Sequence, residues 1–367
     1  MRVLYLYTEL LGYNMPIFER LVSQYEAAVH VIHWTKNKLT PFVPSEHTNS
    51  ARITFYDRSS FTSQQMVDLA LSLKPDLVYV SGWMDRGYFP VLQKLKSKGV
   101  PIVTGLDSQW TGSIRQQVGA LLIRWLYKRL YYSYVWVPGP LQYEYAARVG
   151  FKKTEILSNL LSGNTPLFSE AAASLATEKR YSYPKKFLYV GRFAKQKGID
   201  LLIVAYEIYK KTYHGTWGLT CIGNGPMQQA LELAAANDPQ INIEAFLPQP
   251  ELVKRARAAG AFVLPSRYEP WGVVAHEFSA AGLPLIFSEY VGARQQFLID
   301  GLNGYTFYNE SPQDLAYKMH LLSSQTSDQL VHMGAVSTQL AQRTTPEITA
   351  ASLMSVLSAK LQLTEQL

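Results

Sequence analysis

The chain contains a single cysteine, Cys221, and no run of 18 uncharged apolar residues. One cysteine excludes an internal disulfide and a cysteine-rich metal site, and it fits a reducing compartment such as the cytoplasm. The most apolar segment, residues 118–137, is interrupted by Arg124, Lys128 and Arg129. A membrane-spanning helix is therefore not predicted there.

Low-complexity tracts and internal repeats are also absent, and charged residues make up only 17% of the chain against 47% hydrophobic residues. These values exclude a disordered chain. At 367 residues the chain exceeds the size at which single cores usually split, so two domains are expected. Residues 1–12 have one basic residue and a short apolar run, which predicts a first strand rather than a signal peptide.

The net charge of +7 is concentrated in the first half of the chain. Residues 1–170 hold 18 Lys and Arg against 12 Asp and Glu, which gives +6 and leaves +1 for the rest. A basic half suggests an acidic partner, which charge alone leaves open among nucleic acid, anionic lipid and a phosphorylated substrate.

Strand and helix patterns alternate through the first half. The predicted strands are 2–7, 28–34, 52–57, 76–82, 100–107 and 134–140, and the predicted helices include 16–25, 62–73, 88–97 and 141–149. This alternation predicts a doubly wound α/β sheet whose ligand sites lie at the carboxyl ends of the strands. Gly12 and Asp107 fall at such ends.

Residues 112–134 predict a helix that combines basic side chains with many bulky apolar ones. Leu122, Trp125, Leu126 and Leu130 are spaced to form one apolar stripe. Basic amphipathic helices rich in Trp and Leu often lie on anionic membrane surfaces, so peripheral membrane contact is one interpretation. The other is that the stripe packs on its own domain and the charges are solvated.

Residues 168–184 lack a strand pattern, and we place the interdomain linker there. The chain then divides into residues 1–170, residues 184–345 and a final helical segment, 346–367. The second domain begins a new alternating series with strands at 186–190, 219–222, 241–247, 261–264, 283–289 and 304–307.

The stretch 265–284 of this second domain predicts strand, loop and helix in succession. Pro270 sits where helices often start, so we expect a helix over 271–281. The backbone N–H groups of residues 272–274 would then face an anion above the strand end. Glu269 lies just before the helix and Glu277 about one and a half turns into it, so two carboxylates flank the same pocket.

Other strand ends of this domain offer further polar groups. Arg192 and Lys197 follow one strand and suit a diphosphate, while Gly223-Asn224-Gly225 follows the next and permits close backbone approach. Each signal alone is weak, because a turn or a solvated side chain explains it. Their recurrence at successive strand ends favours a site for an anionic ligand.

The motifs YVGRFAKQKGID, CIGNGP and PSRYEPWGVVAHEFSAAGLPLI, followed by YVGARQQFLIDGLNGYTF, resemble the C-terminal domain of the group 1 glycosyltransferases, the family-4 class of retaining enzymes. The resemblance implies the GT-B fold, two Rossmann-like doubly wound domains that face a central cleft, with a C-terminal helix crossing back to the first domain. It is ordered over residues 186–307 and extends to the first half only as architecture.

By this resemblance, Glu269 contacts donor-sugar hydroxyls, Glu277 binds the ribose, and Arg192 with Lys197 binds the diphosphate. The remaining donor-binding positions implied are Gly12, Asn224, Gly225, Ser266, Trp271, Gly272, Val273 and Val274. The chain departs from the family pattern in its first domain. It has Leu11-Gly12-Tyr13 where many relatives carry Gly-Gly, and Leu106-Asp107 where they carry His-Asp, which leaves Asp107 as the candidate catalytic residue there.

The activity implied is transfer of a hexosyl group, with retention, from a nucleoside-diphosphate sugar to a glycan or lipid-linked acceptor. UDP sugars are favoured and GDP sugars are the alternative. No metal, no further cofactor and no nucleic-acid partner are expected, since the sequence holds neither an Asp-x-Asp motif nor a recognisable nucleic-acid-binding module. The enzyme is expected in the cytoplasm or on the inner face of the cytoplasmic membrane. A nucleotide-sugar 2-epimerase, a non-catalytic lectin-like relative and a basic-surface binding protein remain as alternatives.

Overall fold

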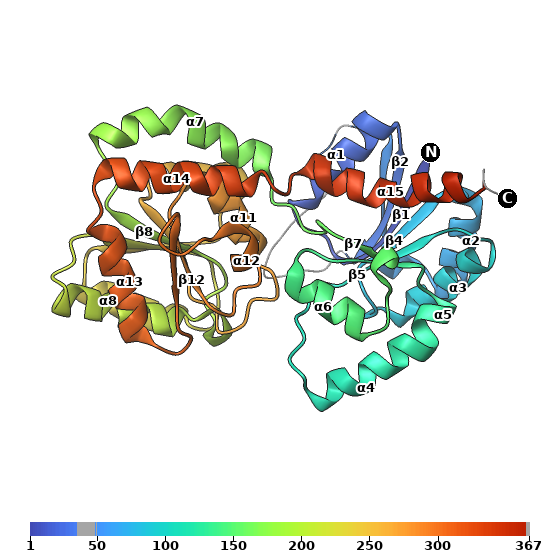
Figure 1. The fold of residues 1–367 in the computed structure, drawn as a ribbon, viewed down its shortest axis with the longest axis horizontal. Coiled ribbons are helices and arrows are strands. Elements are labelled where there is room, and N and C mark those ends of the chain that lie inside the picture. The colour runs from blue at the N-terminus through green and yellow to red at the C-terminus, as the bar shows by residue number, and fades with distance from the viewer. Residues whose placement is uncertain (35–47, 49, 365–367) are drawn as a thin grey trace. The chain divides into compact units, whose positions relative to one another are not determined.

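The structure, a computed structural model, describes residues 1–34, 48 and 50–364. The chain forms two compact units (Figure 1). Unit 1 comprises Met1–Ser162 and Pro346–Leu367, and unit 2 comprises Gly163–Thr345. Unit 2 is therefore one continuous segment between two parts of unit 1, and each unit is built on its own parallel sheet.

The sheet of unit 1 has seven parallel strands in the order β3-β2-β1-β4-β5-β6-β7. Its strands are β1 Arg2–Glu9, β2 Ala28–Trp34, β3 Ile53–Asp57, β4 Leu77–Val80, β5 Ile102–Gly105, β6 Tyr134–Trp136 and β7 Ile156–Leu157. Strand β1 pairs with β2 on one side and with β4 on the other, so Val3 lies opposite both Val29 and Leu77. The central strands β1, β4 and β5 are largely buried because helices cover both faces of the sheet, whereas β3 and β7 at its edges are mostly partly buried. The prediction of a doubly wound sheet is confirmed.

Helices of unit 1 follow the predicted alternation. They are α1 Asn14–Tyr25, α2 Ser63–Leu73, α3 Phe89–Ser97, α4 Ile114–Leu122, α5 Lys128–Leu130, α6 Pro140–Arg148 and the C-terminal α15 Pro346–Thr364. A π-helical turn, Ile123–Tyr127, joins α4 to α5, so residues 114–130 are helical throughout. None of the described helices has the length and apolar character needed to cross a membrane.

The C-terminal helix α15 packs against α1 within unit 1. An ion pair of 2.5 Å between Arg20 of α1 and Glu347 of α15 accompanies this contact. The last three residues of the predicted segment, 365–367, lie outside the described residues.

The sheet of unit 2 has six parallel strands in the order β10-β9-β8-β11-β12-β13. Its strands are β8 Lys186–Val190, β9 Gly218–Ile222, β10 Ile241–Glu244, β11 Ala261–Leu264, β12 Leu285–Ser288 and β13 Gly304–Phe307. The predicted strand positions of this second series are confirmed. In both sheets the order reverses beside the first strand, between β1 and β4 in unit 1 and between β8 and β11 in unit 2.

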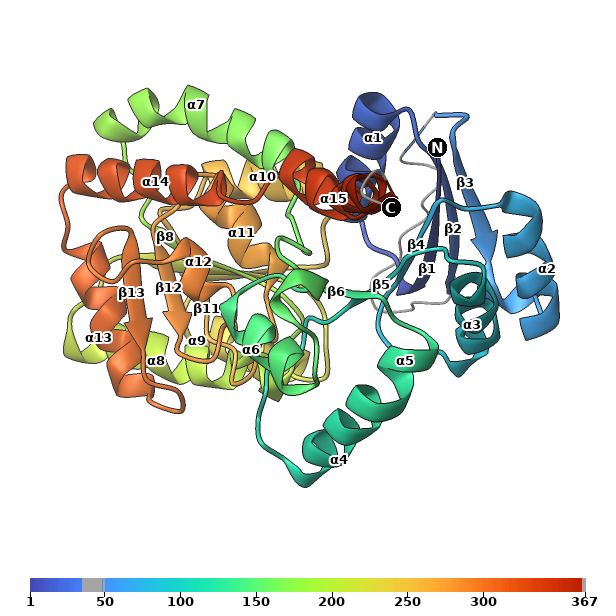
Figure 2. The same cartoon turned by 45° about the vertical axis from the view of Figure 1, so that its right-hand side comes forward.

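Helices cover both faces of the second sheet, with α7 and α14 on one side and α8 and α13 on the other (Figures 1 and 2). The helices are α7 Thr165–Tyr181, α8 Ile199–Thr212, α9 Gln228–Asn237, α10 Gln249–Arg257, α11 Val273–Ala280, α12 Arg294–Phe297, α13 Pro312–Ser323 and α14 Ser327–Ala341. The linker placed at 168–184 is wrong, because most of this stretch forms α7 inside unit 2. Its alanines favour helix, and α7 contacts α10, α11 and α14.

Candidate functional site

The predicted site of unit 2 lies at the carboxyl edge of its sheet, where strand order reverses between β8 and β11. Loops that leave two such neighbouring strands in opposite directions form a crevice, the usual ligand position in open α/β sheets. Residues 191–198 follow β8 and residues 265–272 follow β11. These two loops carry six of the thirteen residues that the sequence predicts: Arg192, Lys197, Ser266, Glu269, Trp271 and Gly272.

An ion pair joins the two loops. The Lys197 ammonium lies 2.6 Å from Oε2 of Glu269, and the Ser266 hydroxyl donates to the same oxygen at 3.2 Å. Glu269 and Ser266 are buried. Gly198 makes this approach possible, because a Cβ there would lie 1.9 Å from the Pro265 carbonyl oxygen. The structure thus brings a predicted phosphate-binding lysine and a predicted sugar-binding carboxylate into direct contact.

Arg267 connects the same two loops, although no motif in the sequence indicates it. Its guanidinium donates to both carboxylate oxygens of Asp200 at the start of α8, at 2.6 and 3.0 Å, and it also pairs with Glu310. Its backbone N–H donates to the Gln196 carbonyl oxygen at 2.9 Å. These two hydrogen-bonded carboxylates raise the pKa of Arg267 above its usual value. Arg267 is a positioning residue for the loop that holds Lys197.

Helix α11 begins at Val273, two residues later than predicted. Gly272 has a φ of 94°, a left-handed conformation that cannot continue a helix, so Trp271 and Gly272 belong to the loop. No side chain caps the helix. The Ala275 N–H donates to the Gly272 carbonyl oxygen at 2.9 Å, whereas the first two N–H groups of a helix, here those of Val273 and Val274, precede the first intrahelical hydrogen bond. These N–H groups of Val273 and Val274 suit an anion.

Trp271, one of the donor-binding positions that the resemblance implies, packs inside unit 2. Its side chain is buried, with its ring edge-on to Phe297 at 5.9 Å between centroids. Its indole N–H finds no hydrogen-bond partner among the described residues. The carbonyl oxygen of Trp271 accepts from Ala293, which fixes the loop before α11.

Glu277 is buried on α11 and has partners different from those of Glu269. Gln249, at the start of α10, donates to its Oε1 at 2.6 Å, and the backbone of Asn164 adds a hydrogen bond. Burial raises the pKa of Glu277 from 4.5 to about 7, although both hydrogen bonds act in the opposite direction. Gly163 closes over this carboxylate, since a Cβ there would lie 2.7 Å from Cγ of Glu277.

The preceding residue, His276, is fully buried and is hydrogen-bonded to the backbone at Gly163, Ala341 and Thr344. Its Nδ1 accepts from the N–H of Gly163 at 2.9 Å, so Nε2 carries the proton that it donates to the Ala341 carbonyl oxygen at 2.8 Å. Its ring stacks on Phe297 with centroids 4.2 Å apart. Burial lowers the pKa of His276 to about 4, which keeps the ring neutral.

The glycines after β9 occupy positions where a larger side chain would be strained or would collide with the backbone. Gly223 has a φ of 148°, and a Cβ on Gly225 would lie 2.4 Å from the Phe193 carbonyl oxygen. Phe193 in turn donates its N–H to the Asn224 carbonyl oxygen at 2.9 Å. The glycines therefore permit a close approach of the loop after β8. Asn224 and Arg192 are both exposed at this edge, and within the described residues the Arg192 guanidinium has no ion-pair partner.

Gly12 and Asp107 belong to unit 1, at the carboxyl ends of β1 and β5. Gly12 lies in the turn between β1 and α1, and its carbonyl oxygen accepts from Met15 at 3.2 Å. The Asp107 side chain is exposed, whereas Leu106 is buried in the core of the unit. The leucine at the expected histidine position therefore serves packing.

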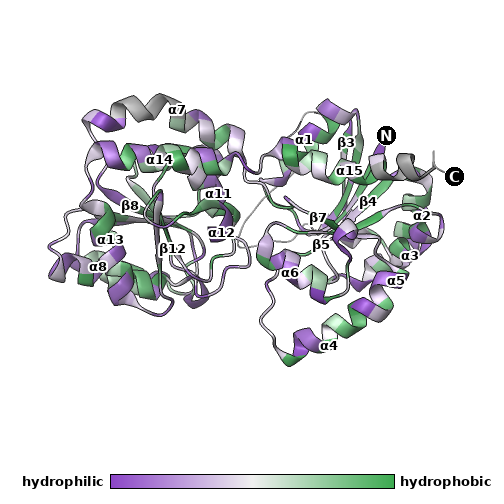
Figure 3. Ribbon diagram, viewed as in Figure 1, coloured by the Kyte–Doolittle hydropathy of each residue, from purple (hydrophilic) through white to green (hydrophobic). Residues whose placement is uncertain are grey.

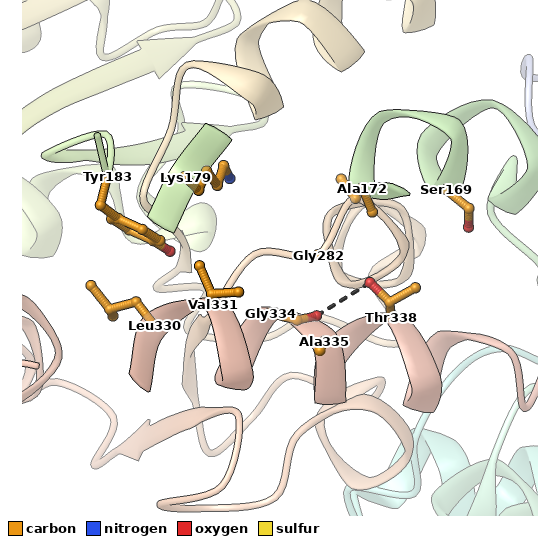
Figure 4. Close-up of a pocket in the computed structure, with 11 residues that line it drawn as sticks. Ser169, Ala172, Lys179, Tyr183, Gly282, Leu330, Val331, Gly334, Ala335 and Thr338 are labelled. Atoms are coloured by element: carbon orange, nitrogen blue, oxygen red, sulfur yellow. Dashed lines mark hydrogen bonds between the residues drawn. The ribbon is translucent and has the colours of Figure 1, made fainter. Parts of the chain in front are cut away.

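A cavity of about 420 Å³ opens in a different part of unit 2, between α7 and α14 (Figure 4). Tyr183 and Lys179 lie at one end and Ser169 at the other. The buried Lys179 ammonium donates to the Ala259 carbonyl oxygen at 3.1 Å, and burial lowers its pKa to about 8. None of the residues that line this cavity belongs to the predicted site.

Residues 173–335, most of unit 2, match the family model described as glycosyl transferases group 1. The matched segment is assigned to the group 1 glycosyltransferases. Glycogen synthase of Mycobacterium tuberculosis is 29% identical over 259 residues, which cover 67% of this chain and 58% of that protein. D-inositol 3-phosphate glycosyltransferase of Thermobispora bispora is 28% identical over 207 residues, or 52% of this chain and 47% of that protein. The chain thus matches about half the length of these curated relatives.

Solved structures extend the likeness to both units. A glycosyltransferase of Rickettsia africae superposes with a TM-score of 0.76 at 12% identity and covers 98% of each chain. Anabaena HepE in complex with UDP-glucose gives 0.74 at 15% identity and covers 98% of this chain and all of that one. At such low identity the likeness shows the fold, which is GT-B.

Proposed function

We propose that the chain is a retaining, metal-independent glycosyltransferase of family 4. It would move a hexosyl group from a nucleoside-diphosphate sugar, with UDP sugars favoured over GDP sugars, to a glycan or lipid-linked acceptor in polysaccharide or glycoconjugate synthesis. The observation that carries the proposal is the Lys197–Glu269 pair, 2.6 Å apart, at the switch point beside the uncapped start of α11. Its single cysteine supports a cytoplasmic setting.

The chemistry of these groups matches the two halves of such a donor. As the glycosidic bond breaks, negative charge develops on the leaving diphosphate. Lys197, the exposed Arg192 and the first-turn amides of α11 would stabilise that charge. Glu269 would accept hydrogen bonds from sugar hydroxyls while it orients Lys197. Together these cations and amides would supply the stabilisation that a metal provides in other transferases.

Glu277 would bind the nucleoside through the ribose hydroxyls. Its carboxylate lies on the same helix as the first-turn amides, which supports contact of both with one donor. Gln249 and the backbone at Asn164 hold the carboxylate in place. Asp107 of unit 1 is the candidate contact to the transferred sugar.

The first test is a thermal-shift panel of UDP, GDP, ADP and their sugar conjugates, because a ligand that binds only the folded state raises the melting temperature. We expect a shift with one diphosphate and its sugar conjugate. Lys197→Met should abolish the shift, whereas Lys195→Met, an exposed lysine of the same loop, should preserve it. No shift with any nucleotide would contradict the proposal.

The reaction type needs a second measurement once the donor is known. NMR of the product with an acceptor should show the anomeric configuration of the donor retained, and activity should persist with EDTA. Conversion of the donor sugar in the absence of an acceptor would instead indicate an epimerase. Ligand binding without any turnover would indicate a lectin-like protein.

A further inference from the structure

An exposed apolar face runs along α4 and the π-helical turn of unit 1. It consists of six large side chains, which we call the α4 stripe: Ile114, Val118, Leu121, Leu122, Trp125 and Leu126. The spacing of three, four and seven residues places them on one side of the helix. Ile114 is 80% exposed and Trp125 is 72% exposed, so neither side chain is covered by the protein.

The helix packs on its own unit through the opposite side. Ala120 and Ile123 are buried in the core of unit 1, and Tyr127 packs against Phe89 with ring centroids 5.4 Å apart. Figures 1 and 2 both show α4 along the outer rim of the unit, and Figure 3 shows hydrophobic positions on it. The interpretation that the predicted stripe packs on its own domain therefore fails for Trp125, whereas Leu122 and Leu126 are 47% and 46% exposed and Leu130 is partly buried.

Positive charge surrounds the α4 stripe. Arg115, Arg124 and Arg129 are exposed on the same helical segment, and the Arg124 guanidinium lies 5.6 Å from the centroid of the Trp125 ring. The sequence has no acidic residue between Asp107 and Glu144. Lys128 is the exception among the basic residues, because it pairs with Glu155 at 2.5 Å. Three arginines therefore remain beside the stripe without an acidic neighbour in this part of the sequence.

We propose that the α4 stripe docks unit 1 on an anionic lipid bilayer. The apolar side chains would enter the boundary between headgroups and acyl chains, and the arginines would contact the headgroup phosphates. Trp125 would lie at the interface, where an amphipathic aromatic ring is favoured. This surface lies in unit 1, whereas the crevice of Lys197 and Glu269 lies in unit 2, so docking does not depend on the proposed transferase activity.

Charge distinguishes this occupant from a second copy of the chain. A two-fold dimer through the α4 stripe would bring the same arginines of two copies together, and the sequence supplies no acid on the segment to separate them. A bilayer rich in anionic lipid matches both features, because its acyl region accepts the apolar side chains and its negative headgroups attract the arginines beside them. Apolar side chains of this size have no role in contacts to nucleic-acid phosphates.

Flotation with lipid vesicles tests the proposal. The full chain is mixed with vesicles that contain about 30% phosphatidylglycerol, or with phosphatidylcholine vesicles alone, at low salt and at about 0.5 M NaCl. The variants are Leu121→Gln with Trp125→Gln, which changes the stripe, and Arg124→Gln with Arg129→Gln, which changes the charge. Leu233→Gln and Lys211→Gln, at exposed positions of unit 2, are the matched controls.

We expect the native chain to float with anionic vesicles and to partition poorly into neutral ones or at high salt. Loss of two arginines should reduce partition about 30-fold at low salt, the stripe variant should lose flotation, and the controls should behave as the native chain. Equal flotation of stripe and control variants would overturn the proposal. If the native chain does not bind vesicles and the stripe variant changes the oligomeric state, the docking proposal is overturned and the α4 stripe is a self-association surface.

Discussion

Replacing Glu277 by glutamine tests how much the buried carboxylate lowers the stability of the fold, separately from its part in ligand binding. Glu277 is buried on α11, and burial raises its pKa from 4.5 to about 7. The folded chain therefore favours the neutral acid. A carboxyl whose pKa is raised on folding contributes its full stability below the unfolded pKa and loses it as the pH rises through the folded value. Native stability should therefore fall between about pH 5 and pH 8 through this group.

The size of this effect follows from the two pKa values. Each pKa unit between folded and unfolded states corresponds to about 1.4 kcal/mol, so the loss for native Glu277 is about 2–3 kcal/mol between pH 5 and pH 8. Glutamine has nearly the same shape, keeps an oxygen that accepts from Gln249, and carries no charge to desolvate. Glu277→Gln should therefore be close to native in stability near pH 5 and more stable than native at pH 8.

Hydrogen exchange of the β11 and β12 amides measures this effect in unit 2 alone, which avoids mixing the unfolding of two units. The matched control is Glu207→Gln, an exposed position of α8, which should change stability by less than about 0.5 kcal/mol at either pH. A Glu277→Gln stabilisation that is equal at both pH values, or that shrinks as the pH rises, would refute the buried-acid argument.

The same carboxyl makes ligand binding depend on pH in the opposite direction. If Glu277 accepts hydrogen bonds from ribose, binding needs the ionised form, so affinity should increase about tenfold from pH 6 to pH 8. A nucleoside-diphosphate sugar is the right probe, because its esterified phosphates do not titrate in this range. Glu277→Gln should bind more weakly and show no such dependence. Calorimetry that finds a pH-independent affinity in the native chain would place the ribose elsewhere.

Two further substitutions test the surroundings of this carboxyl. Gly163→Ala should weaken nucleotide binding about tenfold, because its new methyl group would lie 2.7 Å from Cγ of Glu277. The control is Gly119→Ala, since a Cβ at that position meets nothing within 4 Å. Equal affinities of the two variants in a calorimetric titration would contradict the close contact. His276→Phe should remove the loss of stability expected as the pH falls from 6.5 to about 4, because the low pKa of the buried imidazole makes its protonation unfavourable in the fold. Urea midpoints over that range measure it, and an unchanged slope would show that other groups cause the acid sensitivity.

Strand-end residues were the part of the site that the sequence could predict. Parallel strands end at one edge, so Lys197 after β8 and Glu269 after β11 had to lie near each other once the strands were recognised. The observed 2.6 Å contact agrees with that logic. Sequence spacing could not show that the two side chains would pair with each other, because spacing does not fix rotamers.

Residues that close over the site from distant parts of the chain could not be predicted. Gly163 and Gln249 reach Glu277 through packing, and no periodic pattern connects them with α11. The Gly-Asn pair at 163–164 signals only a turn. The role of Arg267 could not be predicted either, because it depends on ion pairs with Asp200 and Glu310, which are far apart in sequence. The helix α7 was missed because its weak apolar pattern resembled a linker.

The partners of His276 connect the site with the ends of unit 2. The chain enters unit 2 at Gly163 and leaves it soon after Ala341, and one imidazole on α11 holds both backbone segments. The next residue on that helix is Glu277, whose Cγ also faces Gly163. A ligand that changes the charge or position of Glu277 therefore acts directly on the residue at which the chain enters the unit. We expect bound nucleotide to increase protection of the amide of Gly163 in hydrogen exchange, and to do so less in Glu277→Gln. If the exchange protection of the Gly163 amide does not change when the native chain is saturated with nucleotide, ligand binding at Glu277 is not coupled to the segment that enters unit 2.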